Sequence, residues 1–243
     1  MALQFFSCKP KYTFLSSLLL LLLLSSSVAE LSFNFYAGSC PGAELIVRNT
    51  VRSASSSDPS VLGKLLRLIF HDCFVQGCDG SVLIRGNGTE RSDPGNASLG
   101  GFAVIESVKN ILEIFCPGTV SCADILVLAA RDAVEALGGP VVPIPTGRRD
   151  GRVSMAANVR PNIIDTDFTV DKMINIFSSK GLSVHDLVVL SGTLSFLIFK
   201  KERSFFKTNL QFSIYYGSQE RTLLELRIVT RSTAGLSLIQ KAT

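Results

Sequence analysis

Two residues spaced four apart, Arg67 and His71, have the types and the spacing that proton transfer at an oxygen atom requires. On one helix, positions i and i+4 project from the same face, one turn apart. A neutral imidazole can accept a proton there, and the permanent charge of an arginine can stabilise negative charge on a nearby oxygen. Phe70 would line such a site and exclude water. An Arg/His pair on an amphipathic helix is by itself more often structural, so the neighbouring residues decide.

Oxygen donors are concentrated in the stretch that follows His71. They are carboxylates, a hydroxyl and backbone carbonyls that a loop can turn inward, and they belong to Asp72, Val75, Gly77, Asp79 and Ser81. Calcium binds several oxygens of these kinds, so the stretch is a candidate calcium site. The ligand order of an EF-hand is absent. A solvated acidic loop is the alternative interpretation.

Cys73 and Cys78 bracket this loop, and a disulfide between them would hold it in one shape. Together with His71 they could instead bind zinc, although the spacing lacks the closely paired ligands that are typical of zinc sites. Disulfides form in secreted proteins and are rare in the cytosol. The compartment therefore decides between the two interpretations.

The first 29 residues have the layout of a secretory signal peptide. Lys9 and Lys11 precede the apolar run Leu15–Leu24, and small residues continue to Ala29, so we expect cleavage before Glu30. The run is shorter than the roughly 20 apolar residues that span a bilayer. We therefore expect no membrane segment in the mature protein, with an uncleaved N-terminal anchor as the alternative.

Secretion favours the disulfide interpretation. Cys8 lies in the expected signal peptide, which leaves an odd number of cysteines in the mature chain: Cys40, Cys73, Cys78, Cys116 and Cys122. An odd number cannot pair completely within one chain. The formal net charge of +4 is scattered and forms no basic block of the kind that binds nucleic acid, so no nucleic-acid partner is expected.

Apolar residues recur with a helical period through most of the chain between Cys40 and Leu190. The predicted helices are 43–53, 61–74, 102–115, 123–137, 169–179 and 184–190. Gly86–Gly100 is rich in loop-forming residues, and Val141–Arg160 is irregular. Few strand-like alternations occur, so the predicted fold class is mainly α.

Residues 70–83, with the order Phe-His-Asp-Cys-Phe-Val-Gln-Gly-Cys-Asp-Gly-Ser-Val-Leu, resemble the distal signature of class III haem peroxidases, the secreted plant enzymes. Further matching blocks are 34–36, Cys40-Pro41, 120–126, 147–150 and 186–192. The resemblance runs from about Leu31 to Gly192. It implies a haem-peroxidase-like helical fold in which the distal domain is present.

The resemblance assigns a role to each distal residue. His71 matches the base that moves a proton from the inner to the outer oxygen of hydrogen peroxide, beside the wall formed by Phe70. Arg67 matches the residue that polarises the O–O bond. Asn96 matches the asparagine that hydrogen-bonds the histidine and keeps its other nitrogen basic. Glu90 matches the glutamate that links this asparagine to a distal calcium network.

The resemblance also implies ligands, disulfides and cofactors. The implied calcium site comprises Asp72, Val75, Gly77, Asp79 and Ser81, with Glu90 in the network around it. Pro161 matches a proline near the edge where aromatic donors bind. The implied disulfides are Cys40–Cys116 and Cys73–Cys78. The expected cofactors are haem b and calcium.

Two segments match the acceptor pattern for N-glycosylation, Asn87-Gly88-Thr89 and Asn96-Ala97-Ser98. The first lies in an open loop and is the expected site. Because Asn96 is needed inside the distal network, we expect it to remain unmodified.

The proximal half of the family pattern is missing. After Leu-Ser-Gly the family continues with a small residue and then the histidine that ligates the haem iron, whereas this chain has Leu194 there. His185, the other histidine, is expected to be an exposed helix residue, and Cys122 lacks the C-terminal cysteine that the family pairs with it. We predict that residues 30–192 form the distal domain and the start of the proximal domain. Residues 193–243 are predicted to be a non-family segment, which leaves the proximal domain largely absent.

The leading prediction is a secreted peroxidase that reduces hydrogen peroxide and oxidises phenolic donors by one-electron steps. Leu194 at the ligand position predicts little turnover for this chain. The alternative is a non-catalytic, secreted, calcium-binding glycoprotein fragment, and a zinc protein using His71 with Cys73 and Cys78 ranks last. The expected location is the cell wall and apoplast or the vacuole, and the expected state is a monomer.

Overall fold

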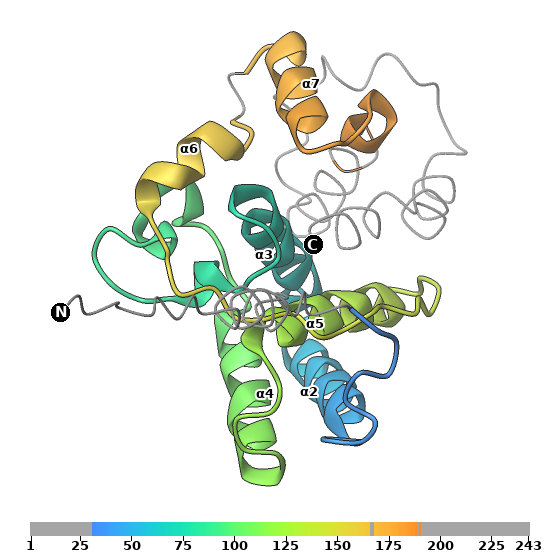
Figure 1. Ribbon diagram of the computed structural model, residues 1–243. Helices are drawn as coiled ribbons and strands as arrows, with labels where there is room; N and C mark the ends of the chain where they lie inside the picture. The colour runs from blue at the N-terminus through green and yellow to red at the C-terminus, as the bar shows by residue number, and fades with distance from the viewer. Residues whose placement is uncertain (1–30, 166–167, 189, 191–243) are drawn as a thin grey trace, which may run out of the picture. The chain divides into compact units, whose positions relative to one another are not determined.

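The computed structural model describes residues 31–165, 168–188 and 190, and these residues are mainly helical (Figure 1), which confirms the predicted fold class. The α-helices are α2 (Ala43–Ser57), α3 (Val61–Val75), α4 (Phe102–Phe115), α5 (Cys122–Ala136), α6 (Val159–Asn162) and α7 (Val170–Ser179). Short 3-10 turns are η1 (Ser81–Leu83), η2 (Glu90–Ser92), η3 (Pro94–Asn96) and η4 (Ala156–Asn158). Residues 184–188 are also helical. Within the described part of the chain, β pairing is limited to one antiparallel bridge between Ser32 and Thr146.

Two predicted segments lie wholly outside these residues. They are the signal peptide, residues 1–29, and the non-family segment, residues 193–243, which includes Leu194. Among the described residues, no helix is both long and apolar enough to cross a membrane.

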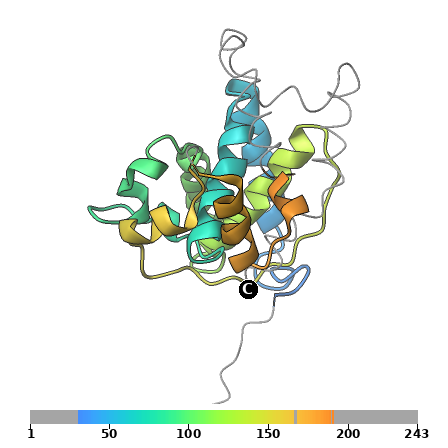
Figure 2. The ribbon, with the colours of Figure 1, turned by 90° about the horizontal axis from the view of Figure 1, so that it is seen from above.

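Helix α5 forms the centre of the helical packing and contacts α2, α3 and α4 (Figures 1 and 2). Every residue from Ala123 to Ala133 is buried, as expected for a helix that is mostly apolar on all sides. Its first turn is capped by Ser121, whose Oγ accepts a hydrogen bond from the backbone N–H of Asp124 at 3.1 Å. The helix is therefore fixed at its start and enclosed along most of its length.

Helix α3 carries the predicted distal residues and is anchored on both sides. Leu65 and Leu68 are fully buried on its inner face. Near its C-terminal end, Phe74 packs against Phe177 of α7 with the ring centroids 5.0 Å apart. Packing on both sides of α3 holds the helix turn that presents His71.

The structure extends or shifts the predicted element boundaries by a few residues. Helix α2 continues to Ser57, four residues beyond its predicted end, and α5 begins at Cys122 rather than Ala123. The predicted loop Gly86–Gly100 contains η2 and η3. Turn η3 forms because the Asp93 carboxylate accepts a hydrogen bond from Gly95 N–H at 2.7 Å, a local interaction that helical periodicity does not reveal.

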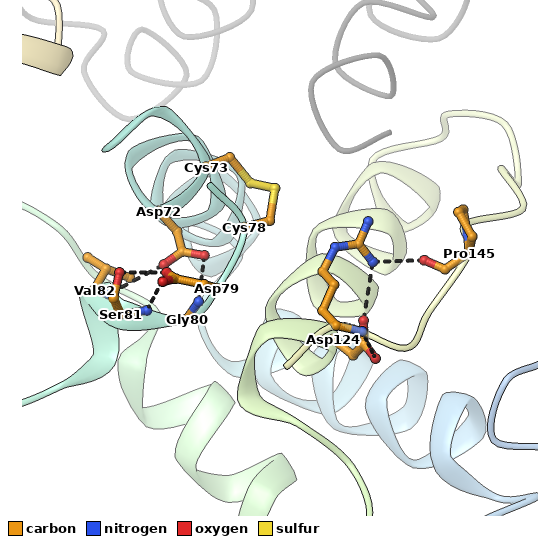
Figure 3. Close-up of a disulfide and its surroundings, with 10 residues drawn as sticks. Asp72, Cys73, Cys78, Asp79, Gly80, Ser81, Val82, Asp124 and Pro145 are labelled. Carbon is orange, nitrogen blue, oxygen red and sulfur yellow. Dashed lines mark hydrogen bonds and ion pairs between the residues drawn. A yellow bond between two sulfur atoms is a disulfide. The ribbon is translucent and has the colours of Figure 1, made fainter. Parts of the chain in front are cut away.

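Both disulfides implied by the resemblance are present. Cys40–Cys116 joins the segment before α2 to the end of α4, and Cys73–Cys78 closes the loop after α3 (Figure 3). Cys122 is a free, half-buried cysteine. Burial, followed by the negative charge of Asp150, raises the pKa of its thiol.

Replacing Cys40 and Cys116 with alanine is expected to lower the free energy of unfolding by about 2–4 kcal/mol. A disulfide restricts the unfolded chain, and the effect grows with loop length; these two cysteines are 76 residues apart. Urea unfolding followed by far-UV circular dichroism measures the loss. A Cys122→Ala background prevents thiol exchange during unfolding.

The matched control replaces Cys73 and Cys78, which are only 5 residues apart. Closing so short a loop restricts the unfolded chain less, so this pair should contribute less stability. Equal losses for the two pairs would contradict the loop-length explanation.

Candidate functional site

Arg67 lies one turn before His71 on α3, and both Arg67 and Phe70 contact the His71 imidazole. Arg67 Nε is 3.4 Å from His71 Nε2, to which it donates a weak hydrogen bond. The Phe70 and His71 rings meet edge to face with their centroids 5.8 Å apart. The helix therefore brings together the base, the cation and the aromatic wall predicted from the spacing.

The tautomer of His71 is set by Asn96. Asn96 Nδ2 donates to the backbone carbonyl of Glu90 at 2.9 Å, which orients the amide so that Oδ1 faces the imidazole. Oδ1 lies 2.7 Å from His71 Nδ1. Because an amide oxygen can only accept, Nδ1 carries the proton and Nε2 keeps its lone pair. His71 is thereby arranged to accept a proton at Nε2.

Burial keeps this imidazole neutral. His71 is 4% exposed, and desolvation, with a smaller contribution from the charge of Arg67, lowers its pKa to about 4. The hydrogen bond with Asn96 opposes this shift. Since the pKa lies well below neutral pH, Nε2 is unprotonated under ordinary conditions and available as a base.

Asn96 is held in place by the turn in which it lies. Asp93 accepts hydrogen bonds from Gly95 N–H through its side chain and from Asn96 N–H through its carbonyl, at 2.7 Å and 2.9 Å. Arg160 of α6 places its Nε 3.4 Å from the same Asp93 carboxylate. The sequence interpretation missed Asp93 and Arg160, since they are 67 positions apart and meet only in the folded chain.

The predicted calcium-binding side chains form an acidic cluster, which we define as Asp72, Asp79, Ser81 and Glu90. Figure 3 shows the first three of them. Asp72 accepts hydrogen bonds from the N–H groups of Gly80 and Val82 at 2.9 Å and 3.3 Å. Ser81 Oγ lies 2.6 Å from Asp79 Oδ1 and 3.1 Å from Glu90 Oε1. One hydroxyl proton cannot satisfy both carboxylates, so the cluster has more acceptors than donors.

Most of the acidic cluster is buried, and burial disfavours its negative charge. Asp72, Ser81 and Glu90 are each 0% exposed, and Glu90 Oε2 has no hydrogen-bond partner. Desolvation, with the charges of Asp79 and Glu90, raises the pKa of Asp72 to about 8. Burial likewise raises the pKa of Glu90. A hard cation would supply the missing positive charge, and the oxygen donors fit calcium.

The cluster is not a preformed metal cage. No group of three or more His, Cys, Asp or Glu side chains in the described part of the chain converges as a metal site. Asp72 points to backbone N–H groups, and Asp79 and Glu90 point to Ser81. Cation binding would therefore require these carboxylates to turn from the N–H and O–H donors toward the ion.

The loop that carries the cluster packs closely on α5. Gly80 has φ of +73°, and a side chain there would place its Cβ 3.1 Å from the backbone nitrogen of Ala123. Gly77, another residue of the loop, has φ of +104°. The left-handed conformation favours glycine at both positions, and the close approach gives Gly80 a second reason.

Lys180 is a further residue at this site that the sequence interpretation missed. It caps the C-terminal end of α7, and its Nζ donates to Asn162 Oδ1 at 2.5 Å and to the Val75 carbonyl at 3.5 Å. Val75 ends α3 and Asn162 ends α6. Lys180 therefore joins three helix ends, one of which carries a predicted calcium-binding carbonyl.

Replacing Lys180 with methionine is expected to lower the free energy of unfolding by about 1–3 kcal/mol, because Asn162 Oδ1 and the Val75 carbonyl lose a charged donor. Urea unfolding of the calcium-free protein measures the change. Lys64→Met is the control: its ion pair with Asp58 is exposed at 38% and 51% and should contribute at most about 1 kcal/mol. Equal effects for the two lysines would contradict the role of Lys180.

Three further residues singled out from the sequence are Pro161, His185 and Leu194. Pro161 lies within α6, next to Asn162, and is exposed. His185, the other histidine of the chain, is exposed in helix 184–188. Leu194, at the position of the family's iron ligand, lies outside the described residues. The distal residues thus fit one face of a haem site, while the described part of the chain provides no second buried imidazole for the iron.

A buried ion pair behind the site was also missed. The Asp124 carboxylate accepts hydrogen bonds from the Tyr36 hydroxyl at 2.7 Å and from Gly147 N–H at 2.7 Å. Arg148 Nη1 lies 3.2 Å from it and also donates to the Pro145 carbonyl (Figure 3). An acid followed by a run of apolar residues, as Asp124 is in α5, is a sequence signal for a buried pair, but its partners lie far away in the chain.

Comparisons with known proteins agree with this geometry. The family model described as Peroxidase matches residues 47–231. Peroxidase 46 of Arabidopsis thaliana is 74% identical over 180 residues, which cover 74% of this chain and 55% of that protein. Peroxidase N1 of Nicotiana tabacum is 53% identical over 160 residues, which cover 65% of this chain and 48% of that protein.

The chain spans about half the length of the curated relatives it matches. The matched range of the family model extends past Gly192, so the domain boundary predicted there stays a prediction. The match includes the whole of α3 and the turn that carries Asn96. On this evidence the chain belongs to the class III plant peroxidase family.

Proposed function

We propose that this chain carries the peroxide-handling side of a haem peroxidase that reduces hydrogen peroxide and oxidises phenolic donors in one-electron steps. The observation that supports it best is the orientation of His71: Nδ1 faces Asn96 Oδ1 at 2.7 Å, and Nε2 faces Arg67. A buried neutral base beside a permanent cation suits proton transfer from a weakly acidic peroxide.

In the proposed mechanism, His71 Nε2 accepts the proton from one oxygen of hydrogen peroxide and returns it to the other oxygen. Arg67 stabilises the negative charge that develops on the departing oxygen, and it cannot lose its own proton. Asn96 keeps Nδ1 protonated throughout, so that Nε2 is always the reacting atom. Phe70 restricts the access of water to these groups.

Haem, when bound, would supply the redox chemistry of this reaction. Arg67, Phe70 and His71 would line its distal face, and the acidic cluster with the Val75 and Gly77 carbonyls would bind calcium behind them. Pro161 would lie at the edge where the phenolic donor binds. Leu194 provides no iron ligand, so uptake of haem is the decisive property of this chain.

The test is to express the full chain, add haem, and record the Soret band together with peroxide-dependent oxidation of a phenol. A Soret band and turnover that is lost in both His71→Leu and Arg67→Leu support the proposal. Turnover that survives His71→Leu would contradict the assigned base. Glu106→Gln, an exposed position on α4, is the control that should retain turnover.

The acidic cluster favours a second candidate function, a non-catalytic secreted calcium-binding glycoprotein. The Asp72 and Glu90 carboxylates are buried and Glu90 Oε2 lacks a partner, which would make calcium important for stability even without haem. A protein that takes up no haem but gains thermal stability with calcium supports this candidate. Metal analysis that finds zinc bound in place of calcium would exclude both functions.

We further propose secretion to the cell wall and apoplast or to the vacuole, as a monomer. The support is the layout of residues 1–29 and the two disulfides, which form in an oxidising compartment. Mass spectrometry of the secreted protein should find a mature N-terminus at Glu30. An intact Met1 in the secreted protein would contradict cleavage of the predicted signal peptide.

A further inference from the structure

Asp93 closes the turn in which Asn96 lies. Its backbone N–H donates to the Glu90 carbonyl at 3.1 Å, and its own carbonyl accepts from Asn96 N–H at 2.9 Å. The Asp93 carboxylate accepts from Gly95 N–H at 2.7 Å, the interaction by which aspartate side chains commonly close turns. Since the Glu90 carbonyl also accepts from Asn96 Nδ2, the turn fixes both the backbone and the amide of Asn96.

The Asp93 carboxylate is buried against α6. Its side chain is 9% exposed, and Arg160 Nε lies 3.4 Å from Oδ1, the oxygen that also accepts from Gly95 N–H. Gly95 passes close to the same helix, since a side chain there would place its Cβ 3.0 Å from Asp93 Oδ1 and 3.6 Å from Val159 Cγ1. The turn is therefore both packed and ion-paired against α6.

Helix α6 is anchored on both sides of Arg160. Val159, the preceding residue, is 0% exposed. Two residues after Arg160, Asn162 Oδ1 accepts from Lys180 Nζ, which also donates to the Val75 carbonyl at the end of α3. Arg160 thus projects from a short helix that cannot shift without disturbing the core or the end of α3. The contacts that begin at the end of α3 return, through α6 and the Asp93 turn, to the base on the same helix.

We infer that Asp93 and Arg160 are positioning residues for His71. They hold Asn96 Oδ1 against His71 Nδ1, which keeps His71 Nε2 able to accept a proton. This inference rests on the proposed function, which names His71 as the base. If the turn loosens, the Asn96 amide rotates and Nδ1 loses its acceptor. The proton of the neutral imidazole then moves to Nε2 in part of the molecules, and those molecules have no base beside Arg67.

The test reads the tautomer of His71 directly. The full chain, labelled with ¹⁵N on histidine, is studied by NMR at neutral pH without haem or peroxide, because protonated and unprotonated ring nitrogens differ in chemical shift. The chain has two histidines, and the exposed His185 is the internal reference. The unaltered chain should carry the proton on Nδ1 of His71. Asn96→Ala gives the tautomer ratio for complete loss of the acceptor.

Three variants separate the turn from the ion pair. Asp93→Ala removes both the acceptor for Gly95 N–H and the partner of Arg160, and it should raise the share of the Nε2-protonated form several-fold. Asp93→Asn keeps an oxygen acceptor and loses only the charge, so it should recover most of the Nδ1-protonated form. Arg160→Met should raise the Nε2-protonated share about twofold, the change expected for a partly exposed ion pair. It should add nothing in the Asp93→Asn background, where the pair is already lost.

Asp165→Asn is the matched control. It removes the other carboxylate paired with Arg160, at 3.0 Å and 46% exposed, and should leave the tautomer unchanged. An unchanged ratio in Asp93→Ala that still folds, by far-UV circular dichroism, overturns the role of Asp93. An unchanged ratio in Arg160→Met, or an equal effect in Asp165→Asn, overturns the role of Arg160 whether or not Asp93→Ala folds. Because the tautomer is read without haem or peroxide, an unaltered chain with Nδ1 protonated and no turnover contradicts the proposed function and not the positioning.

Discussion

Replacing Asp124 with alanine is expected to lower the free energy of unfolding by about 3–5 kcal/mol, because it leaves a buried guanidinium without its carboxylate. Asp124 is 0% exposed and Arg148 is 8% exposed. The substitution also removes the acceptor for the Tyr36 hydroxyl and for Gly147 N–H. Burial and the nearby Asp124 carboxylate already raise the pKa of Tyr36, so the hydroxyl stays protonated and needs an acceptor.

Urea unfolding at neutral pH measures this loss, and Glu106→Gln is its matched control. Glu106 forms an ion pair with Arg85 at 2.7 Å, a shorter contact than the 3.2 Å between Arg148 and Asp124. Both members of that pair are more than half exposed, so its loss should change the free energy by at most about 1 kcal/mol. A similar loss for the two variants would show that burial is not the cause.

Raising the pH from about 4 to about 8 without calcium is expected to destabilise the protein through Asp72. The folded-state pKa of this carboxyl is about 8, against 3.8 for an ordinary aspartate in water. A raised pKa means that the folded protein holds the proton more tightly than the unfolded chain does. The stability it contributes is therefore complete below about pH 4 and lost as the pH rises through 8. The shift sets an upper limit of about 6 kcal/mol.

Calcium should remove this dependence, since a bound cation stabilises the ionised form of the cluster. The measurement is the free energy of unfolding against pH, in a chelator and in calcium. Asp72→Asn should remove the fall in stability that Asp72 causes in chelator and should abolish the calcium effect as well. Asp171→Asn, at an exposed position on α7, is the control and should leave both curves unchanged. Because the lowered pKa of His71 makes stability rise with pH over part of the same range, the test is the difference between the unaltered chain and Asp72→Asn in chelator. A difference that does not change between pH 4 and 8 would contradict the raised pKa of Asp72.

The elements and residue pairs that depend on local order were predictable from the chain. Helices α3, α4 and α5 lie within one residue of the predicted boundaries, because each has a strong apolar period and a clear stop. The proximity of Arg67 and His71 follows from four-residue spacing on one helix. The end of α2 was misplaced because Ser55–Ser57 carry no apolar signal, although the helix continues through them.

Other features depended on the resemblance or could not be predicted. The contact of Asn96 with His71 bridges 25 positions, and the residues alone gave no reason to pair them. The joining of α3, α6 and α7 by Lys180 bridges 105 positions to Val75. Such contacts depend on how loops close over a packed core. A lysine at a polar helix end carries no sequence signal for the partners that it will contact.

By itself, the sequence determined which residue types stand one helix turn apart, where the main helices lie, and which cysteines bracket the loop after α3. These are properties of local spacing, which the helical period fixes before any packing occurs. The tertiary structure decided that His71 is neutral, that Asp72 and Glu90 are buried, and that Asn96 is held against His71. Those properties depend on burial and on partners far away in the chain, because desolvation and hydrogen bonding act only between groups that folding brings together.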